Sequence, residues 1–310
     1  MVAAKGWSVG RTAEVIGFAR TAVRARDERV LIHVLVDPSC PRELVLAVKD
    51  ALVPARSGGR VRVLPLRGCL PSAEPPDAAL ALMGPGSDVA PALAHARQGV
   101  PVALVVEGAL DVALPETEDE LAARVGVVAA SSPEVLADKL ALWLAASVEK
   151  EIALAANFPF CRRAVTQRLI SRCALQNAAV GAVHLIPGSD LPVMTANQVK
   201  LALDIAAAYG RPLEPSRAAE LAGVVCSGLA WRTIARTLLG AVPGIGLLVR
   251  TGVAYGGTLA TGSALRARFD IEPPRKADAS SGDRPQAGEA LPLASPQADD
   301  GYVTIEGGRA

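Results

Sequence analysis

The residues most able to do chemistry in an α/β protein are those of a phosphate-binding loop, and this chain lacks their pattern. The apolar run at 30–36 predicts a buried strand, and a helix is expected from Pro41. The turn between such a strand and helix is where a Walker A loop would lie, with glycines for close backbone approach and a Gly-Lys-Ser/Thr ending. The turn here reads VDPSCPRE (36–43) and contains neither glycine nor lysine.

The other signatures of nucleotide hydrolysis are also missing from the sequence. No lysine follows a glycine, no D-x-x-G occurs, and there is no N-K-x-D or T-K-x-D guanine reader. Asp37 and Glu43 would repel phosphate at a turn that should attract it, and Pro38 and Pro41 lack N–H donors. We therefore predict that the chain is not an enzyme, that it binds neither GTP nor ATP, and that it has no catalytic residues and no cofactor.

The segment GWSVG (6–10) matches the G-x-S-x-G nucleophile elbow, which would expose Ser8 on a strained turn. Its context is wrong, because no apolar strand leads into it and no acid and histidine follow in a compelling order. The favoured interpretation is a tail that enters an amphipathic helix, with Ser8 as its cap.

GPGSD (84–88) is the one segment that could form a ligand site. It follows a predicted strand and precedes a predicted helix, with Ser87 or Asp88 as the cap, so its backbone N–H groups could face an anion. The candidate ligand-binding residues are Gly84, Gly86, Ser87 and Asp88. Many structural turns between strand and helix look the same, so an ordinary turn is the alternative.

Metal and disulfide chemistry have little support in the sequence. The three histidines, His33, His95 and His184, do not cluster along the chain, and the five cysteines are widely spaced without a C-x-x-C pair. We expect no metal site and a reducing compartment. A net charge of +1 on the whole chain gives no reason to expect a nucleic-acid partner.

The order of apolar runs predicts the fold class. Short strand-like runs alternate with helical ones up to about residue 130, which indicates βαβ units and a mostly parallel sheet of about five strands. A helix capped by Ser132, with Pro133 at its first position, is expected to continue to residue 156. The strands are expected at 30–36, 60–66, 78–83, 101–107 and 126–131.

Helical periodicity alone is expected after residue 156, and this region carries a positive charge. Residues 151–269 hold 12 Lys/Arg and five Asp/Glu, a net charge of +7, and are also strongly apolar. The residues from 238 to 265 contain one charge, Arg250, and are long enough to span a bilayer. A break at Pro243-Gly244 and the central Arg250 favour a hairpin, formed by 215–269, that dips into a membrane and returns.

The basic residues beside these apolar helices suit anionic lipid headgroups. These membrane-proximal residues are Arg232, Arg236, Arg266 and Arg268. The rival interpretation is a soluble bundle in which the apolar faces pack on 162–210 and Arg250 pairs with an acid such as Asp204.

Four segments are expected: an N-terminal amphipathic helix (1–28), an α/β domain (29–150), an apolar helical domain (151–269) and a disordered tail (270–310). The tail is rich in Pro, Gly, Ala, Ser and Asp and has few large apolar residues to bury. YVTIEGG (302–308) is its one short apolar piece.

Three segments carry a family resemblance: IPGSDLPVMTANQVKLALDIAAAYG (186–210), PGIG (243–246) and GVAYGGTLATGSA (252–264). They are similar to a helical family known as domain of unknown function 697, which is found after Era-like GTPase domains and in bacterial inner-membrane proteins. The resemblance implies that the upstream α/β domain is a GTPase relative that has lost its loop. The resemblance covers under a third of the chain. Because the phosphate-binding loop is missing, the hydrolase activity of the GTPase domains does not carry over to this chain.

Two functional hypotheses follow. The first is a non-catalytic, membrane-associated scaffold or regulatory pseudo-GTPase on the cytoplasmic face, with membrane lipid as its partner and a protein partner or a homo-oligomer also open. The second is a soluble, cytoplasmic protein that binds an anionic small molecule or a protein at the sheet edge near Gly84–Asp88.

Overall fold

The computed structural model describes residues 9–68, 74–108, 119–183, 191–213, 246–271 and 303–306. The chain divides into two compact units. The α/β unit is formed by residues 30–148 and 274–310, and the helical unit by residues 1–29 and 149–273. The N-terminal helix, which we expected to stand alone, therefore belongs with the later helices, and part of the expected tail belongs with the sheet.

Five parallel strands form the centre of the α/β unit, as predicted. Each lies within two residues of its expected position. The three central strands are runs of buried, mostly apolar residues, which can be covered on both sides inside a parallel sheet. The sheet order is β5-β4-β3-β1-β2-β6. The strands are β1 (Val30–Val36), β2 (Gly59–Pro65), β3 (Ala78–Leu82), β4 (Val102–Val106) and β5 (Val125–Ala129).

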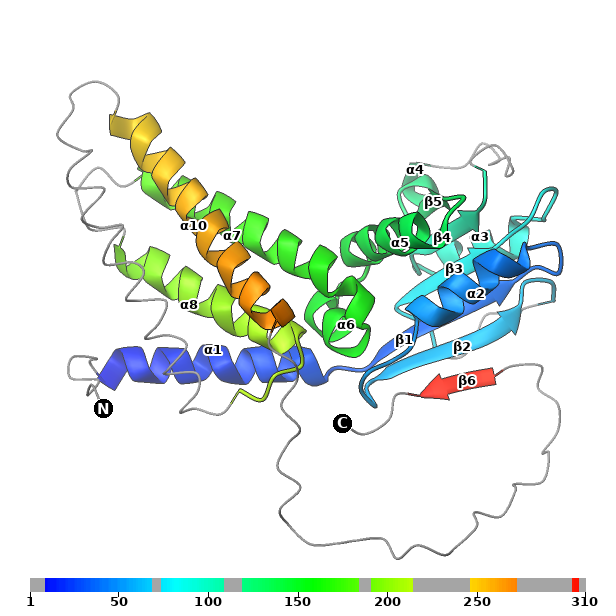
Figure 1. Ribbon diagram of the computed structural model, residues 1–310, viewed down its shortest axis with the longest axis horizontal. Helices are drawn as coiled ribbons and strands as arrows, with labels where there is room; N and C mark the ends of the chain where they lie inside the picture. Colours follow the sequence, from blue (N-terminus) through cyan, green and yellow to red (C-terminus); the bar gives the residue numbers. More distant parts are fainter. Residues whose placement is uncertain are drawn as a thin grey trace, which may run out of the picture. The chain divides into compact units, whose positions relative to one another are not determined.

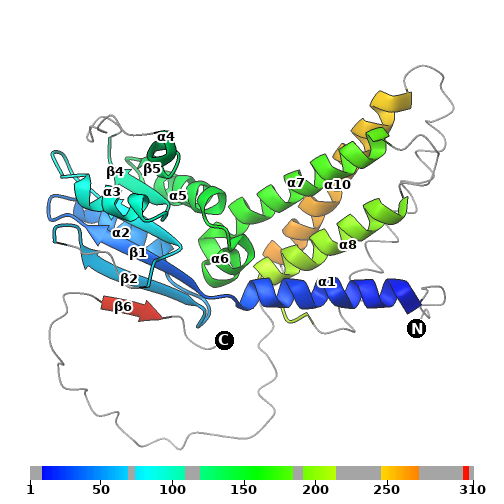
Figure 2. The ribbon, with the colours of Figure 1, turned by 180° about the vertical axis from the view of Figure 1, so that it is seen from behind.

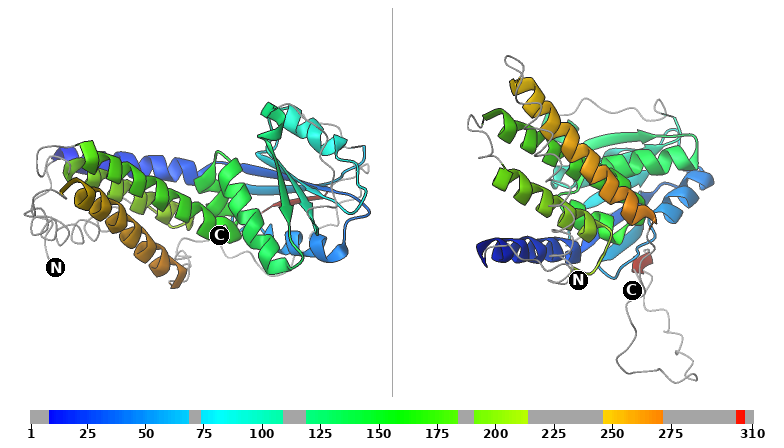
Figure 3. Two further views of the ribbon diagram at one scale, coloured as in Figure 1. Left: turned by 90° about the horizontal axis from the view of Figure 1, so that it is seen from above. Right: turned by 60° about the vertical axis from the view of Figure 1, so that its left-hand side comes forward.

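Helices cover both faces of this sheet (Figure 3, left). Helix α2 (Arg42–Ala51) packs beside α5 (Pro133–Ser147) on one face, and α3 (Ala90–Arg97) lies on the other with the short α4 (Asp119–Ala122). Leu35, Met83 and Leu104 belong to a buried cluster that continues into α3. As predicted, Ser132 caps α5: its hydroxyl accepts a hydrogen bond from the Val135 N–H at 3.4 Å.

A sixth strand completes the sheet from the far end of the sequence. Strand β6 (Val303–Glu306) pairs antiparallel with β2, with Ile305 opposite Val61 (Figure 1). The expectation of a tail without structure from 270 to 310 is therefore wrong at these four residues, whose alternating Val and Ile suit an edge strand, and at residues 270 and 271, which are helical. The remaining tail residues from 272 lie outside the described part of the chain.

The helical unit contains α1 (Val9–Asp27), α6 (Glu151–Asn157), α7 (Arg162–Val183), α8 (Leu191–Ala208) and α10 (Gly246–Ile271), with a 3-10 turn at Pro159–Cys161. The long helix expected from Pro133 to residue 156 is interrupted, because α5 ends at Ser147 and α6 begins at Glu151. Val148 is buried with an extended backbone at this break. The chain passes from one unit to the other here, so tertiary packing overrides a continuous helical propensity.

Helix α8 is the centre of the helical unit, and α1, α6, α7 and α10 all contact it (Figure 2). Helices α7 and α10 run antiparallel: Arg266 donates to the Gln167 side chain at 2.8 Å, and Asn177 donates to the Thr258 hydroxyl at 3.0 Å. Within the described helices, none is both long and apolar enough to cross a bilayer. The first limb of the expected membrane hairpin, from 215 to 245, lies outside the described residues.

Candidate functional site at the ends of strands β1 and β3

The strand order defines where an α/β sheet of this kind would hold a ligand. Strand β1 lies between β2 and β3, so the chain leaves β1 toward one side of the sheet and later continues on the other. In such sheets ligands bind outside the carboxyl ends of the strands, at the point where the order reverses. The turns that follow β1 and β3 meet there, and the second of them is the predicted site Gly84–Asp88.

Gly84 allows these two turns to touch. A Cβ atom at Gly84 would lie 2.2 Å from the backbone oxygen of Ser39, so any other residue would force the turns apart. Gly86 adopts a φ of +77°, a left-handed conformation that favours glycine. Both glycines of the predicted site are therefore required by the backbone, which is a structural reason for the motif.

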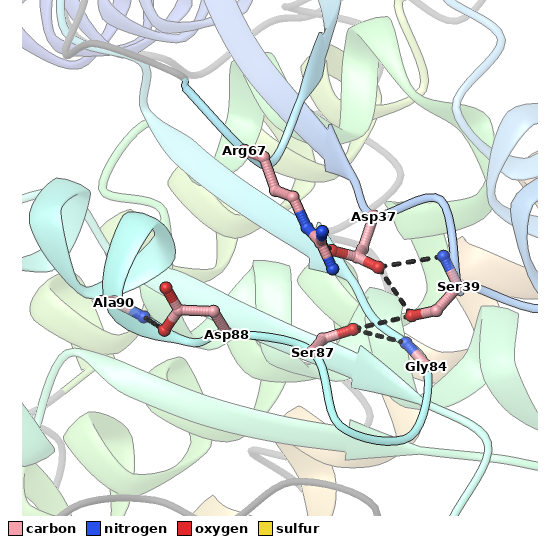
Figure 4. A network of polar contacts seen from close by, with 7 residues as sticks. All are labelled: Asp37, Ser39, Arg67, Gly84, Ser87, Asp88 and Ala90. Atoms are coloured by element: carbon pink, nitrogen blue, oxygen red, sulfur yellow. Dashed lines mark hydrogen bonds and ion pairs between the residues drawn. The ribbon is translucent and has the colours of Figure 1, made fainter.

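Asp37 lies in the interior of the site, fully buried, directly after β1 (Figure 4). Its Oδ1 atom accepts hydrogen bonds from the Ser39 hydroxyl at 2.6 Å and from the Ser39 N–H at 2.9 Å. The exposed Arg67 guanidinium lies 3.4 Å from Oδ2. The Ser39 hydroxyl, the Ser39 N–H, Arg67 and Ser87 together lower the pKa of the Asp37 carboxyl against the opposing effect of burial.

The hydrogen-bond donors of the second turn are also used within the site. The Gly84 N–H donates to the Ser87 Oγ at 3.0 Å, and that oxygen lies 3.0 Å from the Ser39 Oγ. The Asp88 carboxylate accepts from the Ala90 N–H at 2.9 Å, but the N-cap of α3 is Val89, whose side chain makes no capping hydrogen bond, so the predicted cap at Ser87 or Asp88 is wrong. The two turns therefore bind each other, and the N–H groups of Ser39, Gly84 and Ala90 are already committed.

The chemistry open to this arrangement is limited. A buried carboxylate occupies the position where the turn after β1 would approach a phosphate, and it disfavours a second negative charge beside it. Cys40, the nearby nucleophile, has its pKa raised to about 11 by burial and by the charge of Asp37, so its thiol stays protonated.

The structure brings together two histidines that are far apart in the sequence. His33 in β1 and His95 in α3 are both buried, and their ring centroids are 6.1 Å apart in an edge-to-face arrangement. Neither ring nitrogen of His33 has a hydrogen-bond partner, and neither does Nε2 of His95. Burial, together with His95 and Arg62 and against the effect of Glu74, lowers the pKa of His33 from 6.5 to about 4.

Sequence reasoning missed this pair because spacing along the chain does not show which strand lies beneath α3. One signal was present, since His33 interrupts a strand of otherwise apolar residues. His184 lies outside the described residues. In the part of the chain that the structure describes, no three His, Cys, Asp or Glu side chains gather as metal ligands would.

The predicted basic residues are only partly described. Arg266 and Arg268 lie in the last turns of α10, Arg268 exposed and Arg266 half-buried. Arg232 and Arg236 fall outside the described ranges, as does the side chain of Arg250. Asp204, the acid suggested for Arg250, forms an ion pair with Lys200 at 2.5 Å.

Comparisons with known proteins found no relative from which a role for this site could be taken. No family model, no curated protein and no solved structure matches the chain.

Proposed function

We propose that this chain is a non-catalytic scaffold or regulatory pseudo-GTPase that acts at the cytoplasmic face of a membrane. Its α/β unit would be the relative of a GTPase domain that the resemblance of the helical segments implies. Its helical unit would supply the attachment to lipid.

The observation that carries the non-catalytic part is the buried Asp37 at the meeting of the two turns. Its bonds with Ser39, and the bond between Gly84 and Ser87, use the donors that a phosphate would need. An incoming phosphate would have to break these contacts and lie beside a carboxylate whose pKa is lowered, so it is ionised at neutral pH.

Calorimetric titration of the full chain with Mg²⁺ and GTP, and separately with Mg²⁺ and ATP, tests this part. We expect no saturable heat and no release of inorganic phosphate. The variant Asp37→Asn is titrated in the same way as a second sample. It removes the charge of the side chain and keeps its shape. A saturable heat in the parent protein would refute the pseudo-GTPase proposal.

The membrane part rests on charge and composition. The region 151–269 has a net charge of +7, and α10 carries no charged residue from Thr251 to Leu265. Basic residues beside uncharged apolar helices suit an anionic lipid surface. Flotation of the intact protein with anionic and with neutral vesicles is the test, and a protein that stays at the bottom of both gradients would contradict it.

The alternative function, binding of an anionic small molecule near Gly84–Asp88, has less support. Its N–H donors at Gly84 and Ala90 are engaged by Ser87 and Asp88, and Asp88 itself is an acid.

A further inference from the structure

The exposed surface of α7 and α10 changes character along its length. The two helices are antiparallel, so the start of α7 lies beside the end of α10, where Arg266 contacts Gln167. A Cβ atom on Gly262 would lie 2.6 Å from Ile170, so the helices approach closely in their middle. Residues from both helices therefore contribute to each end of one surface, which we name the α7–α10 surface.

The first half of this surface is basic. Arg163 and Arg168 of α7 are exposed, and Arg268 of α10 is exposed at the same end. Arg172 is also exposed but forms an ion pair with Glu151 at 2.6 Å, and Asp270 accepts a hydrogen bond from Tyr209. Three arginines thus face solvent at this end, and the two carboxylates beside them, Glu151 and Asp270, are already engaged by Arg172 and Tyr209.

Among the side chains that the structure describes from Cys173 to Val183 on α7 and from Thr251 to Leu259 on α10, none in the second half of the surface is charged. On α7, Leu175 is 67% exposed, and it is followed by the exposed Ala179 and Ala182. On α10, Tyr255 is 41% exposed, between small residues at 252, 256 and 260 that are also exposed. A large leucine and an amphipathic tyrosine on an uncharged surface suit the boundary between headgroups and acyl chains.

We propose that the α7–α10 surface is where the chain binds an anionic lipid bilayer. The arginine half lies among phosphate headgroups, and the half with Leu175 and Tyr255 dips below them. This inference rests on the membrane part of the proposed function and adds the surface and the lipid class.

Charge complementarity favours a bilayer over a second copy of the chain. In a two-fold pairing of this surface, each half would meet either itself or the other half. The first arrangement sets arginine against arginine, and the second buries arginines against uncharged side chains; both leave charges without partners. An anionic bilayer supplies phosphates for one half and apolar chains for the other.

Flotation of the full chain tests the surface with two variants. Arg163→Gln/Arg168→Gln should reduce partitioning into phosphatidylcholine vesicles that contain phosphatidylglycerol by about 25-fold, since each arginine near an anionic surface contributes about fivefold. Leu175→Glu should reduce it by about tenfold or more, the value of burying one leucine. The first loss should shrink in high salt, because salt screens the attraction.

Matched controls change the same residue types elsewhere on the protein. Arg20→Gln/Arg24→Gln alters two exposed arginines of α1, and Leu142→Glu alters a leucine of α5 that is 59% exposed. Both should float like the parent, and all four variants should keep its far-UV circular dichroism and melting temperature.

The outcomes separate the two proposals. If the parent floats with anionic vesicles and both α7–α10 variants float equally well, the surface is wrong while membrane attachment stands. If the parent floats with no vesicle, membrane attachment fails, and this inference fails with it. A parent that forms dimers by light scattering, broken by Leu175→Glu, without floating, would assign the surface to a second copy.

Discussion

Acid should weaken the α/β unit through His33, well above the pH at which carboxylates become protonated. The pKa of His33 is lowered to about 4 in the folded protein, from 6.5. At a pH between these two pKa values, His33 is protonated in the unfolded chain but not in the folded chain. The free energy of unfolding therefore falls as the pH falls. The two values correspond to a loss of about 2 kcal/mol between about pH 7 and about pH 5, approaching about 3 kcal/mol near pH 4.

The variant His33→Leu isolates this effect. Neither ring nitrogen of His33 has a hydrogen-bond partner, so a leucine of similar size removes the titration without breaking a hydrogen bond. We expect the variant to be at least as stable as the parent near neutral pH and to lose the dependence between about pH 7 and about pH 5. Asp37 does not contribute over this range, because its lowered pKa keeps it ionised.

Urea unfolding followed by tryptophan fluorescence measures the difference. Trp143 lies in α5 of the α/β unit, so a background of Trp7→Phe/Trp231→Phe leaves one reporter for the relevant unit. If the leucine variant and the parent lose the same stability on acidification, His33 is not the group responsible, and the reasoning from its burial is wrong.

Two further predictions concern glycines. Gly84→Ala should destabilise the α/β unit by roughly 3 kcal/mol in urea unfolding, because its methyl group would meet the Ser39 carbonyl; an unchanged midpoint would contradict the close approach of the turns. In α10, Gly262→Ala should destabilise the helical unit by about 1–3 kcal/mol and be relieved by Ile170→Ala, whose side chain it meets. Gly256→Ala, with no atom within 4 Å of its new methyl group, should instead stabilise by about 1 kcal/mol, and equal effects at the two glycines would refute the packing.

The sequence predicted elements where local pattern dominates. Short, valine-rich runs such as 102–106, which follows Pro101, favour strands, and Ser132-Pro133 marks a helix start from its own chemistry. The interruption at Val148 was not predictable, because residues on both sides favour helix and only the change of unit breaks it. Strand β6 is too short for its pattern to indicate a partner.

Only one of the two turns that form the candidate site could be predicted from the sequence. Gly84–Asp88 was found because glycines and a helix cap mark a turn after a strand. The turn that contacts it, with Asp37 and Ser39, was identified only as a departure from the pattern of a phosphate-binding loop. Contact between the two turns depends on β1 lying next to β3, and sheet order is not a local property of the sequence.

Strand β6 has a consequence for biosynthesis. A ribosome delivers β1 to β5 and their helices long before residues 303–306, so the outer edge of β2 is without a neighbour while most of the chain is being made. Unpaired edges of this kind recruit other strands and promote aggregation. Proteolytic removal of the last forty residues would expose that edge again on a sheet whose five parallel strands remain intact. Chains shortened in this way should therefore be the preferred substrates of chaperones and proteases.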